Sequence, residues 1–135
     1  VFCITNLSFT GIKIIGESTD SVMVHAYDYD NYLDSLKKQI VSTKTIVFLD
    51  QNIPFHLDHI IQSTKNVPKP EEYYPDLCSA FDRIENAFKV KVIIACHPRA
   101  NKVLLQSYYK GRHVVLGVTN DVVRECELCI SHYSR

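Results

Sequence analysis

The chain lacks the features that mark membrane-spanning, secreted and nucleic-acid-binding proteins. No stretch of its 135 residues approaches the roughly 20 consecutive apolar residues that a membrane span requires. The first residues carry neither a basic segment nor a small-residue cleavage site, so we expect no secretory signal. Lys and Arg together number 15, as do Asp and Glu, and zero net charge gives no general attraction for nucleic acid or an anionic membrane.

The common phosphate-binding and metal-binding motifs are also absent. Neither G-x-G-x-x-G nor G-x-x-x-x-G-K-[ST] occurs, which removes the main support for a dinucleotide site or a P-loop. Asp28 and Asp30 lack the glycine and terminal glutamate of a calcium loop, so we predict that one of them caps a short helix over residues 34–39. His56 and His59 have no apparent third ligand, and we interpret them as a surface-loop pair. The sequence therefore predicts no metal site.

Five cysteines, an odd number, are scattered at positions 3, 78, 96, 126 and 129. This pattern is typical of reduced core thiols in a cytosolic protein. Cys126 and Cys129 have CxxC spacing, but a zinc or redox site would need a second pair or a suitable turn. We interpret them as two buried thiols at a helix-to-strand junction.

The apolar fraction of 46% and the charged fraction of 22% are those of a globular domain. Residues 1–40 carry only short apolar runs, at 1–5, 12–15 and 22–26, and we interpret them as a linker or the tail of a preceding domain. From residue 45 the pattern becomes regular. We expect strands at 45–49, 90–96, 113–117 and 128–131, and helices at 70–89, 102–109 and 119–125.

Strands that alternate with helices predict βαβ units, and hence an α/β fold with a Rossmann-like open parallel sheet and flanking helices. The first of these helices begins with Pro70 followed by two acidic residues, as helix starts commonly do. Its predicted buried stripe is made by five apolar residues: Leu77, Ala80, Phe81, Ile84 and Phe88. We assign residues 41–135 to this domain. The non-Met start and the abrupt end after a strand lead us to expect truncation at both ends.

Ligands of open parallel sheets bind outside the carboxyl ends of the strands. The residues of interest at the ends of the four predicted strands are Asp50, then His97, Pro98 and Arg99, then Gly117 and Thr119, and finally His132 and Ser134. An arginine, histidines and a helix start near 119 suit a phosphorylated, anionic ligand, and glycine permits close backbone approach. Each residue also has a structural alternative: Asp50 in a turn, His97 at a strand end, Arg99 as a solvated charge, and Thr119 as a helix cap.

The chain from residue 47 resembles the C-terminal half of bacterial GT-B type glycosyltransferases. The pattern is closest to the capsule- and surface-polysaccharide group, which is similar to bacterial sialyl- and polysialyltransferases. Four segments carry the resemblance: Phe48-Leu49-Asp50-Gln51, residues 93–100 with His97-Pro98, Gly117-Val118-Thr119, and residues 130–134.

The resemblance implies that His97 and Pro98 contact the donor nucleotide, with Thr119, His132 and Ser134 near its phosphate or ribose. It further implies a metal-independent transferase without a cofactor, using a nucleotide-sugar donor, with a CMP-sugar favoured, and a saccharide acceptor. The catalytic base would come from an N-terminal domain in the remainder of the polypeptide. The expected location is cytoplasmic, or peripheral at the inner membrane for the full-length protein. Where the family has a Ser-Ser-Thr-like run after the histidine, this chain has Tyr133-Ser134-Arg135.

Two alternatives of other kinds stay open. One is a non-catalytic Rossmann-like interaction module, for which Tyr73-Tyr74 and Tyr108-Tyr109 are candidate exposed aromatics. The other is a nucleotide-sugar epimerase or glycerophosphate transferase of the same architecture.

Overall fold

A computed structural model describes residues 2–3, 22–23, 27–61 and 66–132 of the chain. It divides into two compact units, Val1–Gln39 and Ile40–Arg135. In the first unit, β1 (Phe2–Cys3) pairs in parallel with β2 (Val22–Met23), and the helix α1 spans Tyr27–Leu36. The apolar run expected at 12–15 lies outside the described residues.

The position predicted for the first helix was wrong. Because α1 already begins at Tyr27, Asp28 and Asp30 lie in its first turn and neither of them precedes it as a cap. Acidic residues in a first turn still favour the helix, since they face the positive end of its dipole.

The second unit is a four-stranded open sheet in which every pair of neighbouring strands is parallel. Its strands are β3 (Thr45–Asp50), β4 (Lys91–Cys96), β5 (Val114–Val115) and β6 (Leu128–Ser131), in the order β5-β4-β3-β6. The prediction of a Rossmann-like parallel sheet is confirmed. The predicted 113–117 strand is shorter than expected, because β5 pairs with β4 at only two positions and the backbone turns at Gly117, where φ is +78°.

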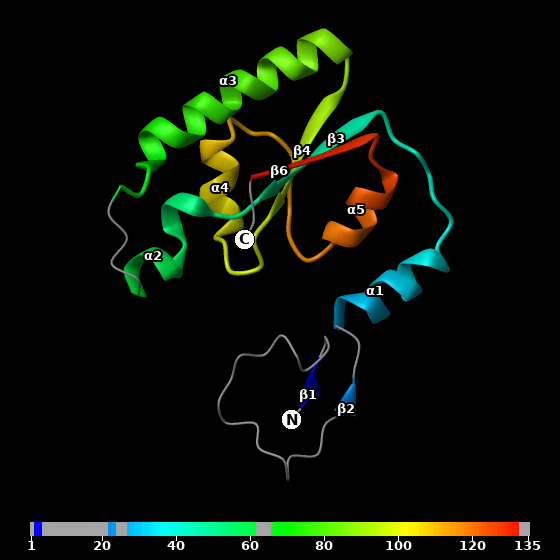
Figure 1. The fold of residues 1–135 in the computed structure, drawn as a ribbon. Coiled ribbons are helices and arrows are strands. Elements are labelled where there is room, and N and C mark those ends of the chain that lie inside the picture. The colour runs from blue at the N-terminus through cyan, green and yellow to red at the C-terminus, as the bar shows by residue number, and fades with distance from the viewer. Residues whose placement is uncertain (1, 4–21, 24–26, 62–65, 133–135) are drawn as a thin grey trace. The chain divides into compact units, whose positions relative to one another are not determined.

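Helices cover both faces of this sheet (Figure 1). Helices α3 (Pro70–Phe88) and α4 (Lys102–Tyr108) pack on one face, and α5 (Thr119–Glu125) packs on the other. Successive residues of a strand point to opposite faces, so Phe48 joins the larger core under α3 and α4 while Val47 joins the smaller core with Val122 and Val123. Burial on both faces explains the continuous apolar sequence of β3.

The buried stripe of α3 differs from the predicted one. Tyr74, Cys78 and Phe81 are buried, whereas Ala80 is exposed and Phe88 is 66% exposed. The large rings decide the rotation of the helix, because Tyr74 and Phe81 pack against Tyr109 of the α4 terminus. Tyr74 and Tyr109 are each 0% exposed, so the expectation that these tyrosines form an exposed aromatic surface was wrong for both.

The chain between β3 and α3 is more regular than the polar loop that we expected. It contains a 3-10 helix, η2 (Ile53–Phe55), followed by the short helix α2 (Leu57–Ile61). Asn52 adopts a left-handed conformation, with φ 56°, which asparagine tolerates better than most residues and which starts the 3-10 turn.

Two of the four thiols described are buried: Cys78 and Cys96. Burial raises the pKa of both thiols, so they stay protonated, as expected of core cysteines. The CxxC segment does join α5 to β6, as predicted. The prediction that both of its thiols are buried was wrong, since Cys129 is exposed.

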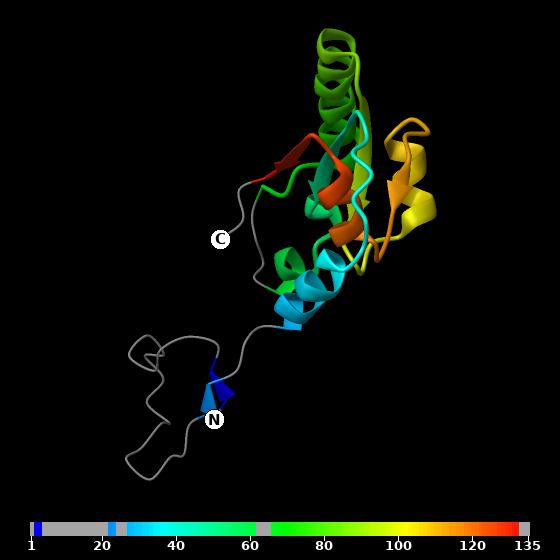
Figure 2. The same cartoon turned by 90° about the vertical axis from the view of Figure 1, so that its right-hand side faces the viewer.

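The strand order determines where a ligand can bind. The chain enters the sheet at β3, proceeds outward through β4 to β5, and returns to the other side of β3 as β6. Figure 2 shows β5 and β6 at opposite edges of the sheet. The carboxyl ends of β3, β4 and β6 therefore meet at one end of the sheet, where ligands bind in folds of this kind. Among the helices that the structure describes, none is long and apolar enough to cross a membrane.

Candidate functional site

A pocket of about 770 Å³ opens at the carboxyl ends of β3 and β4. This volume lies within the range of small-molecule sites. Its walls are formed by two loops and the start of α4, with the lining residues Asn52, Phe55, His56, Leu57, His97, Pro98, Arg99, Asn101, Leu104 and Leu105. His97, Pro98 and Arg99, which the sequence predicts at a binding edge, all belong to it.

The loop after β4 holds the His97 ring in a defined orientation. The strand ends before Pro98, which has no N–H to donate to a neighbouring strand. The Arg99 N–H donates to Nδ1 of His97 at 3.2 Å, and the Ala100 N–H donates to the His97 carbonyl at 2.8 Å. Because Nδ1 is an acceptor, a neutral His97 ring carries its proton on Nε2 and can donate it to a ligand.

The loop after β3 is shaped by Asp50. This residue is 4% exposed, and its Oδ1 accepts a hydrogen bond from the Asn52 N–H at 2.8 Å. The Asn52 carbonyl in turn accepts from the Phe55 N–H at 2.9 Å. This succession of turns carries Phe55 and His56 into the wall of the pocket. Asp50 thus has the turn role that we considered for it, and it is not among the residues that line the pocket.

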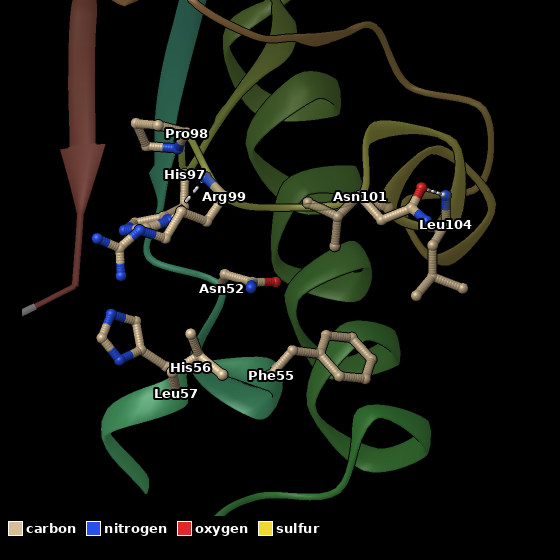
Figure 3. A pocket seen from close by; sticks show the side chains of 10 residues that line it. Asn52, Phe55, His56, Leu57, His97, Pro98, Arg99, Asn101 and Leu104 are labelled. Atoms are coloured by element: carbon tan, nitrogen blue, oxygen red, sulfur yellow. Dashed lines mark hydrogen bonds between the residues drawn. The ribbon is translucent and has the colours of Figure 1, made fainter. Parts of the chain in front are cut away.

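His56 is a pocket residue that the sequence analysis did not select. Its ring centroid lies 5.4 Å from that of His97 and 6.1 Å from that of His59. Figure 3 shows the rings of His56 and His97 and the Arg99 side chain at one end of the pocket, with Phe55 and Leu104 toward the other. Within the described residues, no group of three or more His, Cys, Asp or Glu side chains is placed to hold a metal ion.

The interior behind the pocket contains an unusually polar cluster. Asp50 Oδ2 and the hydroxyls of Tyr74 and Tyr109 are buried without a hydrogen-bond partner in the part of the chain that the structure describes. Burial raises the pKa of the Asp50 carboxyl above its usual range. The Asn52 N–H and the nearby Tyr109 hydroxyl oppose this rise only in part. Burial and the Asp50 charge likewise raise the pKa of both tyrosines, so these phenols stay protonated.

His132 lies on the other side of Asp50, immediately after β6. Its Nε2 shares a hydrogen bond of 2.5 Å with the hydroxyl of Tyr73 on α3, and its ring is nearly perpendicular to that of Phe48, with the two ring centroids 5.2 Å apart. Burial raises the pKa of Tyr73, and the charge of Asp50 adds to the effect. Both His132 and His97 act on the Asp50 carboxyl and lower its pKa. Asp50 therefore lies between the two predicted histidines, His97 and His132. Tyr73, the hydrogen-bond partner of His132, was not selected from the sequence.

Gly117 and Thr119 are not among the residues that line this pocket. Gly117 is exposed, and a Cβ built on it would meet no atom within 4 Å, so its positive φ is what requires glycine there. Thr119 is the first residue of α5, which packs on the opposite face from α3 and α4. The predicted cap at Thr119 was wrong, because Val118 occupies the cap position and no side chain bonds there. Ser134 lies outside the described residues.

No family model matches the chain, and neither a curated protein nor a solved structure matches it. The chemistry of the pocket is therefore what indicates a function for this chain. Of its ten lining residues, none is a carboxylate, a hydroxyl or a thiol. Such a wall can bind and orient a ligand and stabilise negative charge, but it offers no carboxylate to act as a general base.

Proposed function

We propose that the second unit binds a nucleotide-sugar donor, as the donor half of a metal-independent glycosyltransferase of surface-polysaccharide biosynthesis. The observation that carries the proposal is the placement of His97-Pro98-Arg99 directly after a central parallel strand, in the wall of a pocket of ligand size. The order of this motif and the neighbouring strand ends is what resembles the capsule-polysaccharide group.

The two halves of the pocket suit the two parts of a nucleotide. One end offers the imidazoles of His56 and His97 and the guanidinium of Arg99, which can pair a phosphate bidentately. The other end offers Phe55 and Leu104, apolar groups against which a flat base can lie.

Glycosyl transfer breaks the bond between the anomeric carbon of the donor sugar and the phosphate oxygen of the nucleotide. Negative charge accumulates on that leaving oxygen, and donors placed around it in advance lower the barrier. His97 Nε2–H and Arg99 can supply such donors without a metal. The acceptor hydroxyl must lose its proton to a base, and in this proposal another part of the polypeptide provides that base. A CMP-sugar as donor, a saccharide as acceptor and a cytoplasmic or inner-membrane-peripheral location belong to the same proposal.

The test is a titration of the protein with CMP, CDP, UDP and GDP, followed through backbone amide shifts by NMR. We expect one nucleotide to shift the amides of Asn52, His97 and Arg99 selectively, which would also identify the base. His97→Gln should weaken that binding about tenfold or more, since hydrogen bonds to charged groups contribute about 1.5–3 kcal/mol.

His113→Gln is the matched control, because His113 is an exposed histidine outside the pocket. It should bind like the unmodified protein. A folded protein whose pocket amides do not move with any nucleotide at millimolar concentration would refute the proposal.

A further inference from the structure

We infer that His56 is a phosphate-binding residue that acts together with His97, and that it sets the direction in which a nucleotide lies in the pocket. The inference rests on the proposed function for the identity of the ligand. It rests on the geometry of the pocket for the anion site itself.

The rings of His56 and His97 lie close together in the pocket wall. They come from different loops, one after β3 and one after β4, yet their centroids are 5.4 Å apart and nearly perpendicular at 76°. Both rings are part of the pocket wall, and neither is buried in a core. Two imidazoles that meet in this way can direct N–H groups toward one oxyanion from two sides, which a single strand-end histidine cannot do.

Hydrogen bonds of the two loops hold both rings in place. The His56 loop is fixed through the buried hydrogen bond between Asp50 Oδ1 and the Asn52 N–H, while the His97 ring is fixed by the Arg99 N–H. A site that is ordered before the ligand arrives loses less entropy on binding. Arg99 lies beside the two rings at this end and favours an anion, whereas Asp50 is buried, and burial disfavours its charged form.

The direction of a bound ligand follows from the two chemically different ends of the pocket. The anion-binding end contains His56, His97 and Arg99, and Asn52 lies between it and the apolar end. Phe55 is 37% exposed and its inner side packs on Tyr108 and Tyr74, so one part of its ring is available to a base while the other is supported. A nucleotide with its phosphate between the histidines therefore places its base against Phe55.

The experiment measures the affinity of the full chain for three probes: inorganic pyrophosphate, CDP and cytidine. It compares the unmodified protein with His56→Gln, His97→Gln and His59→Gln. His59 is the control, since it lies on α2, three residues after His56, with its ring centroid 6.1 Å from that of His56, but it does not line the pocket. We expect His56→Gln and His97→Gln each to weaken pyrophosphate and CDP about tenfold. The His59→Gln affinities should stay within about twofold of the unmodified protein, and cytidine binding should be unaffected by all three.

The outcomes separate this inference from the proposed function. If CDP shifts the pocket amides but His56→Gln binds it normally, the inference is overturned and the donor-site proposal survives. If pyrophosphate binding depends on His56 but no nucleotide binds more tightly than pyrophosphate, the anion site stands and the donor proposal fails. A folded protein that binds neither pyrophosphate nor CDP at millimolar concentration overturns both. Far-UV circular dichroism of each variant establishes that it is folded.

Discussion

Replacing Asp50 tests whether the buried carboxyl shapes the pocket and carries a charge that the fold disfavours. Two substitutions separate these effects. Asp50→Asn keeps an oxygen that can accept from the Asn52 N–H but removes the titrating group. Asp50→Ala removes both, and it leaves a buried N–H without its 2.8 Å partner.

The expected sizes follow from the geometry. A buried donor without a partner costs about 1–3 kcal/mol, so Asp50→Ala should have a free energy of unfolding lower than that of Asp50→Asn by that amount at any pH. For Asp50→Asn the effect depends on pH. Because burial raises the pKa of Asp50 in the folded state, the folded protein holds this proton when the unfolded chain, with a pKa of about 3.9, has already released it. The unmodified protein therefore loses stability as pH rises from about 4 through the folded-state pKa, by at most about 1.4 kcal/mol per pH unit.

The assay is urea unfolding followed by far-UV circular dichroism between pH 4 and pH 8. Other carboxylates and histidines titrate in both proteins, so the informative quantity is the difference in unfolding free energy between Asp50→Asn and the unmodified protein. This difference should become more favourable to the variant as pH rises and then level off above the folded-state pKa. A difference that stays constant across the range, or that moves in the opposite direction, would refute the reasoning.

Two further substitutions test the core around this site. Tyr74→Phe removes a hydroxyl that is buried and unpartnered among the described residues, so we expect an unfolding free energy that is unchanged or higher by up to about 1 kcal/mol in thermal or urea unfolding. A clear loss would show that the hydroxyl is bonded. Arg112→Met should lower stability by about 1–2 kcal/mol in the same assay, because the Arg112 side chain, 11% exposed, pairs with Asp82 and Glu85 and lies 5.7 Å over the Phe81 ring. An unchanged midpoint would mean that burial of the charge offsets these contacts.

The architecture of the sheet could be predicted because its signals are local. The continuous apolar runs of β3 and β4, the proline-led start of α3, and the glycine after α4 at 111 each depend on neighbouring residues only. The rotation of α3 could not be predicted in the same way. Leu77, Ile84 and Phe88 satisfy the helical period as well as Tyr74 and Cys78 do, and the choice between the two stripes is made by Tyr109, which arrives from the end of another helix.

The same distinction explains which site residues could be found. His97-Pro98-Arg99 could be selected because a proline ends a buried strand, and whatever follows such a strand lies at the ligand edge. His56 follows no strand directly. It reaches the pocket because the Asn52 N–H donates to Asp50 and the backbone of Asn52 is left-handed. The 3-10 helix that follows then places His56 beside His97 in the loop after β4. The sequence of that turn carries a signal: Asp50 is followed two positions later by Asn52 and then by Ile53-Pro54. This signal predicts a turn, but it does not predict which part of the fold the turn brings His56 to. The position of a residue in such a loop depends on the adjacent strand and cannot be predicted from neighbouring residues alone. For this reason the sequence suggests that His56 pairs with His59 on the surface, whereas in the fold His56 lies beside His97.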